Sequence, residues 1–224
     1  MAAVVVVGAA QLAITLPEIR EHNRPSVENY VRNTLKSAPP DAIVVESGDH
    51  RLFGFIYAQN VLHLRPDISF VNPGPMGQAW YRRDLGARIG VNLDTPSRGP
   101  IGPLTLSRRL AATGRPLYYT DFYDAKLEPL HHESVGTLMR IKNEADPASE
   151  PEALERQNTE LFGQFTMEPT LPNDPYGWGY GFMKDYARPW VELANAYGER
   201  GDAERALACF ARAKALAPGF VTEQ

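Results

Sequence analysis

Residues 42–49 read AIVVESGD, and residues 68–72 read ISFVN. Each stretch opens on a short, largely apolar run that ends at polar residues, which is typical of a strand covered on both faces. Between them lies a stretch with helical spacing, followed by the helix-ending sequence Arg65-Pro66-Asp67. A strand, a helix and a strand joined by short connections predict a right-handed crossover and a parallel sheet.

Further elements extend this unit in both directions. A first helix is predicted by the spacing of Val27, Tyr30, Val31 and Leu35, with Asn23 or Ser26 as the expected cap. A second is predicted by Phe53, Ile56, Tyr57 and Val61, with Asp49 as the expected cap. A third contains Trp80, Tyr81 and Leu85. After a loop over 91–103, we expect a helix over 104–112, a strand over 117–120 and an edge strand over 135–141. The pattern predicts an α/β domain over 23–146, with a Rossmann-like, mostly parallel sheet covered by helices.

The C-terminal region carries the clearest local motif. The tetratricopeptide (TPR) pattern W-x2-L-G-x2-Y, A-x3-F and a closing proline is matched by Trp190, Leu193, Ala194, Tyr197, Gly201, Ala206, Phe210, Ala213 and Pro218. Only Ala194 departs from the pattern, since it replaces glycine. We predict a TPR-like helical hairpin over 186–219, turning at Gly201-Asp202. One repeat cannot bury its apolar face alone, so the hairpin is expected to pack on the α/β domain.

Residues 147–185 are expected to form a linker and an aromatic loop. The stretch PNDPYGWGYGFMKDYARPW, residues 172–190, interleaves aromatic residues with glycines. Such rings stack on sugars or lie at a membrane interface. They more often pack between two structural units, and we favour that interpretation here.

The N-terminal segment 1–22 opens on MAAVVVVGAAQLAITL, which is almost entirely apolar. No basic residue precedes the run, and a full spanning helix needs about 20 apolar residues, so neither a secretory signal nor a complete span fits. We interpret the segment as the end of a transmembrane helix. The alternative is a buried strand over 3–7 followed by a short core helix, which the β-branched valines favour.

Composition narrows the functional classes. The 224 residues carry 23 basic and 27 acidic side chains, for a net charge of -4, and show no basic stripe, which disfavours a nucleic-acid partner. Cys209 is the only cysteine, so neither an internal disulfide nor a cysteine-based zinc site can form. The dinucleotide motif G-x-G-x-x-G and the phosphate-binding motif G-x-x-x-x-G-K-[ST] are both missing from the sequence, so we predict no cofactor.

Candidate ligand-binding residues follow the two predicted strands. In an open parallel sheet ligands bind beyond the carboxyl ends of the strands, which here present Glu46, Ser47 and Asp49 beside Asn72. A purely structural role is the alternative, with Asp49 capping its helix and Asn72 joining two loops. Neighbouring His131 and His132 would point to opposite faces of an extended chain, so we predict no metal site there. No spacing in the sequence identifies a catalytic set, so we nominate no catalytic residue.

The stretch from Pro40 to Leu85 resembles part of a known family. It is similar to the extracytoplasmic C-terminal region of a bacterial membrane-protein family that includes the eukaryotic transmembrane protein O-mannosyltransferase of plexin-type receptors. The matching residues are Pro39, Pro40, Ala42, Ile43, Gly48, Asp49, Phe53, Tyr57, Gln59, Arg65, Pro66, Asp67, Val71, Asn72 and the pair Trp80-Tyr81; residues 115–120, RPLYYT, match a later strand. The chain departs from the family where GDND becomes Gly48-Asp49-His50-Arg51, since a cation replaces the second carboxylate.

The resemblance implies a GT-C-type architecture, in which a polytopic membrane part transfers a sugar from a polyprenyl phosphate to a protein hydroxyl. It implies that this chain is an accessory domain on the extracytoplasmic, periplasmic side, and it adds Trp80 and Tyr81 to the candidate ligand-binding residues. The expected partners are the membrane part of the same or an adjacent protein and the acceptor protein. A free-standing TPR-containing interaction module without transferase activity is the rival hypothesis.

Overall fold

Strands from the first two thirds of the chain form one mixed sheet. The computed structural model describes residues 2–22, 25–94, 101–121, 130–142, 146–167 and 178–219. Within these ranges the strands are β1 (Ile43–Val45), β2 (Ser69–Val71), β3 (Leu117–Tyr119), β4 (His132–Val135) and β5 (Leu138–Ile141), in the order β2-β1-β3-β5-β4. β1 runs parallel to β2 and β3, whereas β5 runs antiparallel to β3 and β4. The predicted α/β class and the parallel pairing of the first two strands are confirmed.

The last part of the sheet differs from the prediction. A single edge strand over 135–141 was expected, but the chain reverses at Gly136-Thr137 and forms the hairpin β4-β5. Gly136 has φ of 61°, a left-handed conformation that glycine adopts at little cost. The expectation of one strand was therefore wrong, and β4 rather than β5 forms the edge of the sheet.

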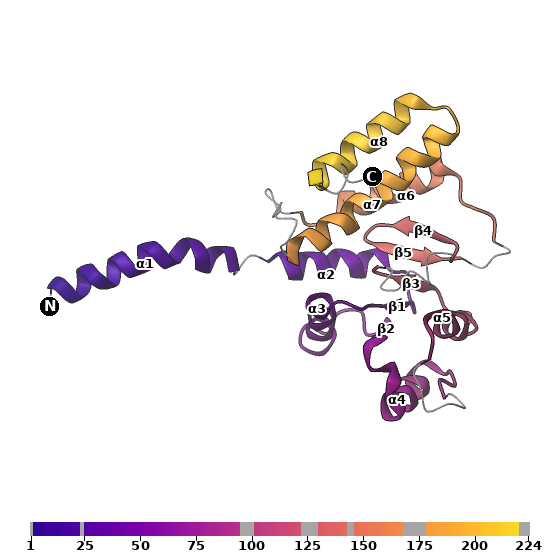
Figure 1. Ribbon diagram of the computed structural model, residues 1–224, viewed down its shortest axis with the longest axis horizontal. Coiled ribbons are helices and arrows are strands. Elements are labelled where there is room, and N and C mark those ends of the chain that lie inside the picture. Colours follow the sequence, from indigo (N-terminus) through magenta and orange to yellow (C-terminus); the bar gives the residue numbers. More distant parts are fainter. Residues whose placement is uncertain are drawn as a thin grey trace.

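Helices cover both faces of the sheet (Figure 1). They are α1 (Ala2–His22), α2 (Ser26–Ser37), α3 (Asp49–Asn60), the short 3-10 helix η1 (Gly74–Gly77), α4 (Ala79–Ile89), α5 (Pro103–Ala111), α6 (Pro151–Gln164), α7 (Trp178–Glu199) and α8 (Ala203–Leu216). Ile43 and Val45 of β1 join a core with α4 and α5. Val44, between them, joins the core formed with α2, α3 and α7 on the opposite face.

Helix α3 buries a different face from the one its apolar spacing predicts. Phe53, Ile56 and Tyr57 are 65%, 45% and 50% exposed, whereas Phe55 and Ala58 are buried. The cause is a close approach to α2, because a Cβ at Gly54 would lie 2.7 Å from the side chain of Val31. Ser26 and Asp49 do not cap their helices as expected, since Pro25 and Gly48 hold the cap positions. Asn23, the other expected cap, lies outside the described residues.

The C-terminal helices form a hairpin that packs against the sheet. α7 and α8 make a shared core in which Trp190, Tyr197 and Cys209 are buried. The turn lies at the predicted place, with Gly201 at φ of 77° and Asp202 capping α8 through the Arg205 N–H. α7 begins at Trp178, earlier than residue 186, and α6 occupies part of the segment 147–185 that was expected to be a linker.

Two aromatic residues of the Gly-rich stretch can be placed. Phe182 and Tyr186 are 3% exposed and lie on α7 against Tyr30 of α2, with ring centroids 4.2 Å and 5.9 Å away. For these two rings, packing between structural units is confirmed. Tyr176 lies outside the described residues.

Helix α1 extends away from the body (Figure 1). It exposes Val5, Val6, Val7, Leu12 and Ile14, each by more than half of its surface. The alternative of a buried strand over 3–7 is therefore wrong. Among the described helices, none combines the length and the hydropathy that crossing a bilayer requires.

Candidate functional site

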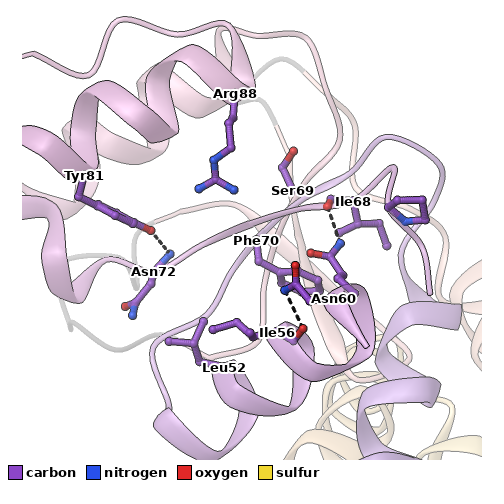
Figure 2. A pocket seen from close by; sticks show the side chains of 11 residues that line it. Leu52, Ile56, Asn60, Ile68, Ser69, Phe70, Asn72, Tyr81 and Arg88 are labelled. Carbon is purple, nitrogen blue, oxygen red and sulfur yellow. Dashed lines mark hydrogen bonds between the residues drawn. The ribbon is translucent and has the colours of Figure 1, made fainter. Parts of the chain in front are cut away.

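A groove of about 540 Å³ runs along the β2 edge of the sheet, between α3 and α4. Figure 2 shows Leu52, Ile56 and Asn60 of α3 on one side, Tyr81 and Arg88 of α4 on the other, and Phe70 of β2 between them. The remaining lining residues are Gln59, Pro66, Ile68, Ser69 and Asn72. The groove thus joins an apolar wall, several polar groups and one cation.

The floor of the groove is the open edge of β2. The Ser69 N–H donates to the carbonyl of Ala42, and the Val71 carbonyl accepts from the Glu46 N–H, both at 2.9 Å. Because successive residues of a strand turn their backbone groups to opposite sides, the N–H and C=O of Phe70 point away from β1. The Phe70 backbone therefore faces the groove side of the strand.

Side chains satisfy the outward backbone groups on either side of Phe70. The Gln59 amide donates to the Ile68 carbonyl at 2.8 Å, and the Asn72 N–H donates to the Tyr81 hydroxyl at 3.0 Å (Figure 2). In the described ranges no group bonds to the N–H or the C=O of Phe70. One donor and one acceptor remain open in the middle of the groove.

Two of the residues proposed from sequence line this groove, and the neighbouring Trp80 is not among its lining residues. Asn72 and Tyr81 line it and bond to one another. Trp80 is 61% exposed on the adjacent turn, with its ring centroid 5.7 Å from that of Tyr81. Burial raises the pKa of the Tyr81 hydroxyl. Asn72 also accepts a 2.9 Å hydrogen bond from the Gly74 N–H, two residues later, which lies within one turn and does not join two loops.

Glu46 belongs to a different environment. It is fully buried at the carboxyl end of β1, within 4.0 Å of the Arg51 guanidinium, and accepts a hydrogen bond from the Gly48 N–H at 2.5 Å. Arg51 bonds at 2.9 Å to Asp185 of α7. The Tyr30 hydroxyl donates to the same Asp185 oxygen at 2.6 Å. We call these four side chains the buried cluster.

The buried cluster lies where the strand order reverses between β1 and β3, which is where ligands bind in many open α/β sheets. In this chain, protein side chains occupy that position. Arg188 of α7 completes the arrangement, since it donates at 3.2 Å to Asp185 and at 3.1 Å to the Thr120 carbonyl at the end of β3. The cluster therefore joins α2, α3 and α7 to the sheet.

Burial shifts the protonation equilibria of the cluster. It raises the pKa of Glu46 to about 7, against the opposing effect of Arg51. Burial also raises the pKa of Asp185, and the guanidinium groups of Arg51 and Arg188 oppose that effect. The pKa of Tyr30 rises far above its ordinary value through burial and through the neighbouring Asp185. Arg51 thus favours the ionised form of both carboxylates, and Arg188 favours that of Asp185.

Ser47 and Asp49 do not join either site. Both are exposed beyond the end of β1, and Asp49 is the first residue of α3. The structure therefore separates the predicted set into the groove residues Asn72 and Tyr81, the buried Glu46, and three exposed side chains, those of Ser47, Asp49 and Trp80. Arg51, the cation that follows Asp49 by two positions, pairs with Asp185 and lies within 4.0 Å of Glu46.

The His131-His132-Glu133 stretch lies at the edge of the sheet. Glu133 pairs with Arg140 and, at 2.9 Å, with Lys142, while His132 lies 3.7 Å from Glu192 of α7. Burial raises the pKa of Glu133, but hydrogen bonds from Lys142 and Arg140 outweigh this and lower it to about 2. Within the described ranges no group of three metal-binding side chains occurs.

Sequence reasoning missed several residues of both sites. Arg88, Phe70 and Leu52 of the groove follow no motif, since helix orientation alone brings them together. Asp185 lies 155 positions from Tyr30, so no local spacing could pair the two. A charged residue inside the otherwise apolar face of α7 was the one available signal, because buried carboxylates are found paired.

Comparison of the chain with protein-family models, with curated proteins and with solved structures finds no match.

Proposed function

We propose that this chain is an accessory domain of a GT-C-like protein O-glycosyltransferase, placed on the extracytoplasmic side of the membrane. In this proposal the polytopic membrane part performs the transfer from a polyprenyl-phosphate sugar, and the present chain supports that part and holds the acceptor protein. The sequence resemblance between Pro40 and Leu85 supplies the reaction class.

The observation that carries the proposal is helix α1. Its apolar side chains are exposed, and it extends away from the body (Figure 1). Exposed apolar surface of this extent is costly in water and marks a contact with protein or lipid. In the proposal this helix packs against the membrane part.

The finer fold assignments form part of the same proposal. The order β2-β1-β3, with α3 between the first two strands and α4 and α5 before the third, supports a Rossmann-like half. The α7-α8 hairpin, with Trp190, Tyr197 and Ala213 in its core, supports a TPR-type repeat.

Site-specific crosslinking tests this function. A photoreactive residue replaces Leu12, which is 57% exposed, and the tagged chain is added to solubilised membranes of the source cells. We expect a covalent adduct with a polytopic membrane protein that transfers sugar from a polyprenyl phosphate to protein hydroxyls. Val61, which is 57% exposed on the body, provides the matched control position. A partner without transferase activity, or equal capture from both positions, would contradict the proposal.

The outer face of α8 favours a second candidate. Leu207 and Phe210 are 70% and 42% exposed there, and a lone TPR-type hairpin leaves the face that a following repeat would cover open. This supports a protein-interaction module that lacks transferase activity. Crosslinking from Leu207 to a protein without membrane helices, with none from Leu12, would favour this second candidate.

A further inference from the structure

The two edges of the sheet differ in how their outward backbone groups are hydrogen-bonded. In β4 the outward residues are His132 and Ser134, because Lys142 N–H bonds to the His131 carbonyl and places residues 131, 133 and 135 toward β5. The Ser134 N–H donates to Glu192 of α7 at 3.0 Å, and its carbonyl accepts from the Asn158 amide at 3.1 Å. Helices α6 and α7 therefore close this edge at Ser134.

The β2 edge has no equivalent closure at its centre. Gln59 and Tyr81 bond to the outward groups of Ile68 and Asn72, but the N–H and C=O of Phe70 between them have no partner in the described part of the chain. An open donor and acceptor on a strand edge form a template for another extended chain. A groove of about 540 Å³ lies along this edge.

The walls of the groove suit the side chains of such a segment. Ile56 lines the groove and is 45% exposed, and Leu52 lies one turn before it on α3. On the opposite wall Arg88 has an exposed guanidinium, whose one ion pair within the described ranges is with the exposed Asp84, at 3.3 Å. The walls offer an apolar contact on the α3 side and a cation on the α4 side.

We propose that this groove binds an extended peptide segment, which adds to the sheet at β2. The segment donates one backbone hydrogen bond to the Phe70 carbonyl and accepts one from the Phe70 N–H, as in other β-strand additions. It places an apolar side chain against Leu52 and Ile56 and an acidic side chain near Arg88. The identity of the peptide as part of the acceptor protein rests on the proposed function.

The hydrogen-bond pattern favours a peptide over a sugar. The paired N–H and C=O of one strand residue match the paired C=O and N–H of an extended chain at the strand spacing of about 4.8 Å. A sugar needs no such pairing and would bond instead to Asn60, Asn72 or Arg88. The two ligand classes therefore differ in whether the Phe70 amide becomes protected.

Peptide binding to the purified full chain tests the proposal. The probes are acetylated and amidated hexapeptides in which valine alternates with threonine and one position is aspartate. We expect saturable binding that slows hydrogen exchange at the Phe70 amide and leaves Ser69 and Val71, already bonded to β1, unchanged. A probe with an N-methyl group on its central residue should bind about tenfold more weakly, since it loses one backbone hydrogen bond.

Matched variants locate the binding surface. Ile56→Lys places a charge in the groove and should weaken binding at least about tenfold, whereas Tyr57→Lys, on the same helix but outside the lining, should leave binding unchanged. Both positions are exposed, so both variants are expected to fold, and circular dichroism checks this.

Three outcomes would overturn the proposal: no probe binds, the Phe70 amide gains no protection, or Ile56→Lys and Tyr57→Lys bind alike. Protection of groove amides by a mannose oligosaccharide in place of the peptides would assign the groove to a sugar. The assay contains no membrane part, so its failure leaves the Leu12 crosslinking result standing. Peptide binding without that crosslink would instead leave the groove assigned and remove the transferase role.

Discussion

The Tyr30 hydroxyl of α2 donates a 2.6 Å hydrogen bond to Asp185 of α7, a residue 155 positions later in the chain. Both side chains are almost completely buried. Arg51 of α3 reaches the same carboxylate at 2.9 Å. One buried carboxylate thus joins three helices, and its charge is balanced inside the protein rather than by water.

Asp185→Ala should destabilise the protein by about 3–5 kcal/mol, because it leaves the buried Arg51 guanidinium without its closest counter-ion. Tyr30→Phe keeps the ring stacked on Phe182 and removes only the hydroxyl, so a loss of about 1–3 kcal/mol is expected. Urea unfolding measures both. Arg32→Ala, in an exposed pair with Glu28, should cost no more than about 1 kcal/mol. Equal losses for all three variants would contradict the role of the buried cluster.

Glu46 should make stability depend on pH. Its pKa is about 7 in the folded protein, against an ordinary value of 4.5, so the folded state holds the proton more tightly than the unfolded state. The resulting contribution to the free energy of unfolding is fully present below pH 4.5 and is lost as pH rises through 7. Glu46→Gln stays neutral and should gain about 2–3 kcal/mol relative to the parent chain between pH 4.5 and 8. Unfolding in urea at several pH values measures this gain. A stability difference that stays constant with pH would show that Glu46 does not ionise in this range.

Glu192 should hold the α7-α8 hairpin against the sheet. Its carboxylate accepts from the Ser134 N–H at 3.0 Å and from the Ser134 hydroxyl at 2.7 Å. Glu192→Ala removes both bonds and should cost about 1–3 kcal/mol. It should also speed hydrogen exchange at the Ser134 amide. Glu199→Ala, in the exposed last turn of α7, should change neither quantity. Unchanged exchange at Ser134 would mean that other contacts keep this edge closed.

Gly136 should tolerate no side chain. Its φ is 61°, and an added Cβ would contact the Oγ and Cβ of Ser37 in α2. Gly136→Ala is therefore expected to destabilise the chain by about 2 kcal/mol or more, from strain and from displacement of α2. Gly163→Ala in α6 meets nothing within 4 Å and should be neutral or stabilising by up to about 1 kcal/mol. Thermal unfolding of the two variants tests the contrast, and similar melting temperatures would contradict it.

The amino-acid sequence by itself determined the local elements. The β-branched run before Glu46 specifies β1, the helix-ending Arg65-Pro66-Asp67 separates α3 from β2, and Gly201-Asp202 sets the turn of the hairpin. These signals are local, because periodicity, turn conformations and caps act over a few residues. The candidate residue Asn72 could be named for the same reason, since it follows a strand, whereas Tyr81 was named only because the family resemblance includes it.

The tertiary structure alone decided which surfaces met. The apolar face of α3 that the spacing marks as buried is exposed, because Gly54 lets the other face approach α2. Arg51 and Asp185 lie far apart in the sequence and pair only when α7 folds over the sheet. The backbone of Phe70 is open because none of the described side chains reaches the centre of the β2 edge, whereas Glu192 and Asn158 close the β4 edge at Ser134. Such pairings depend on long-range packing, which local sequence patterns do not encode.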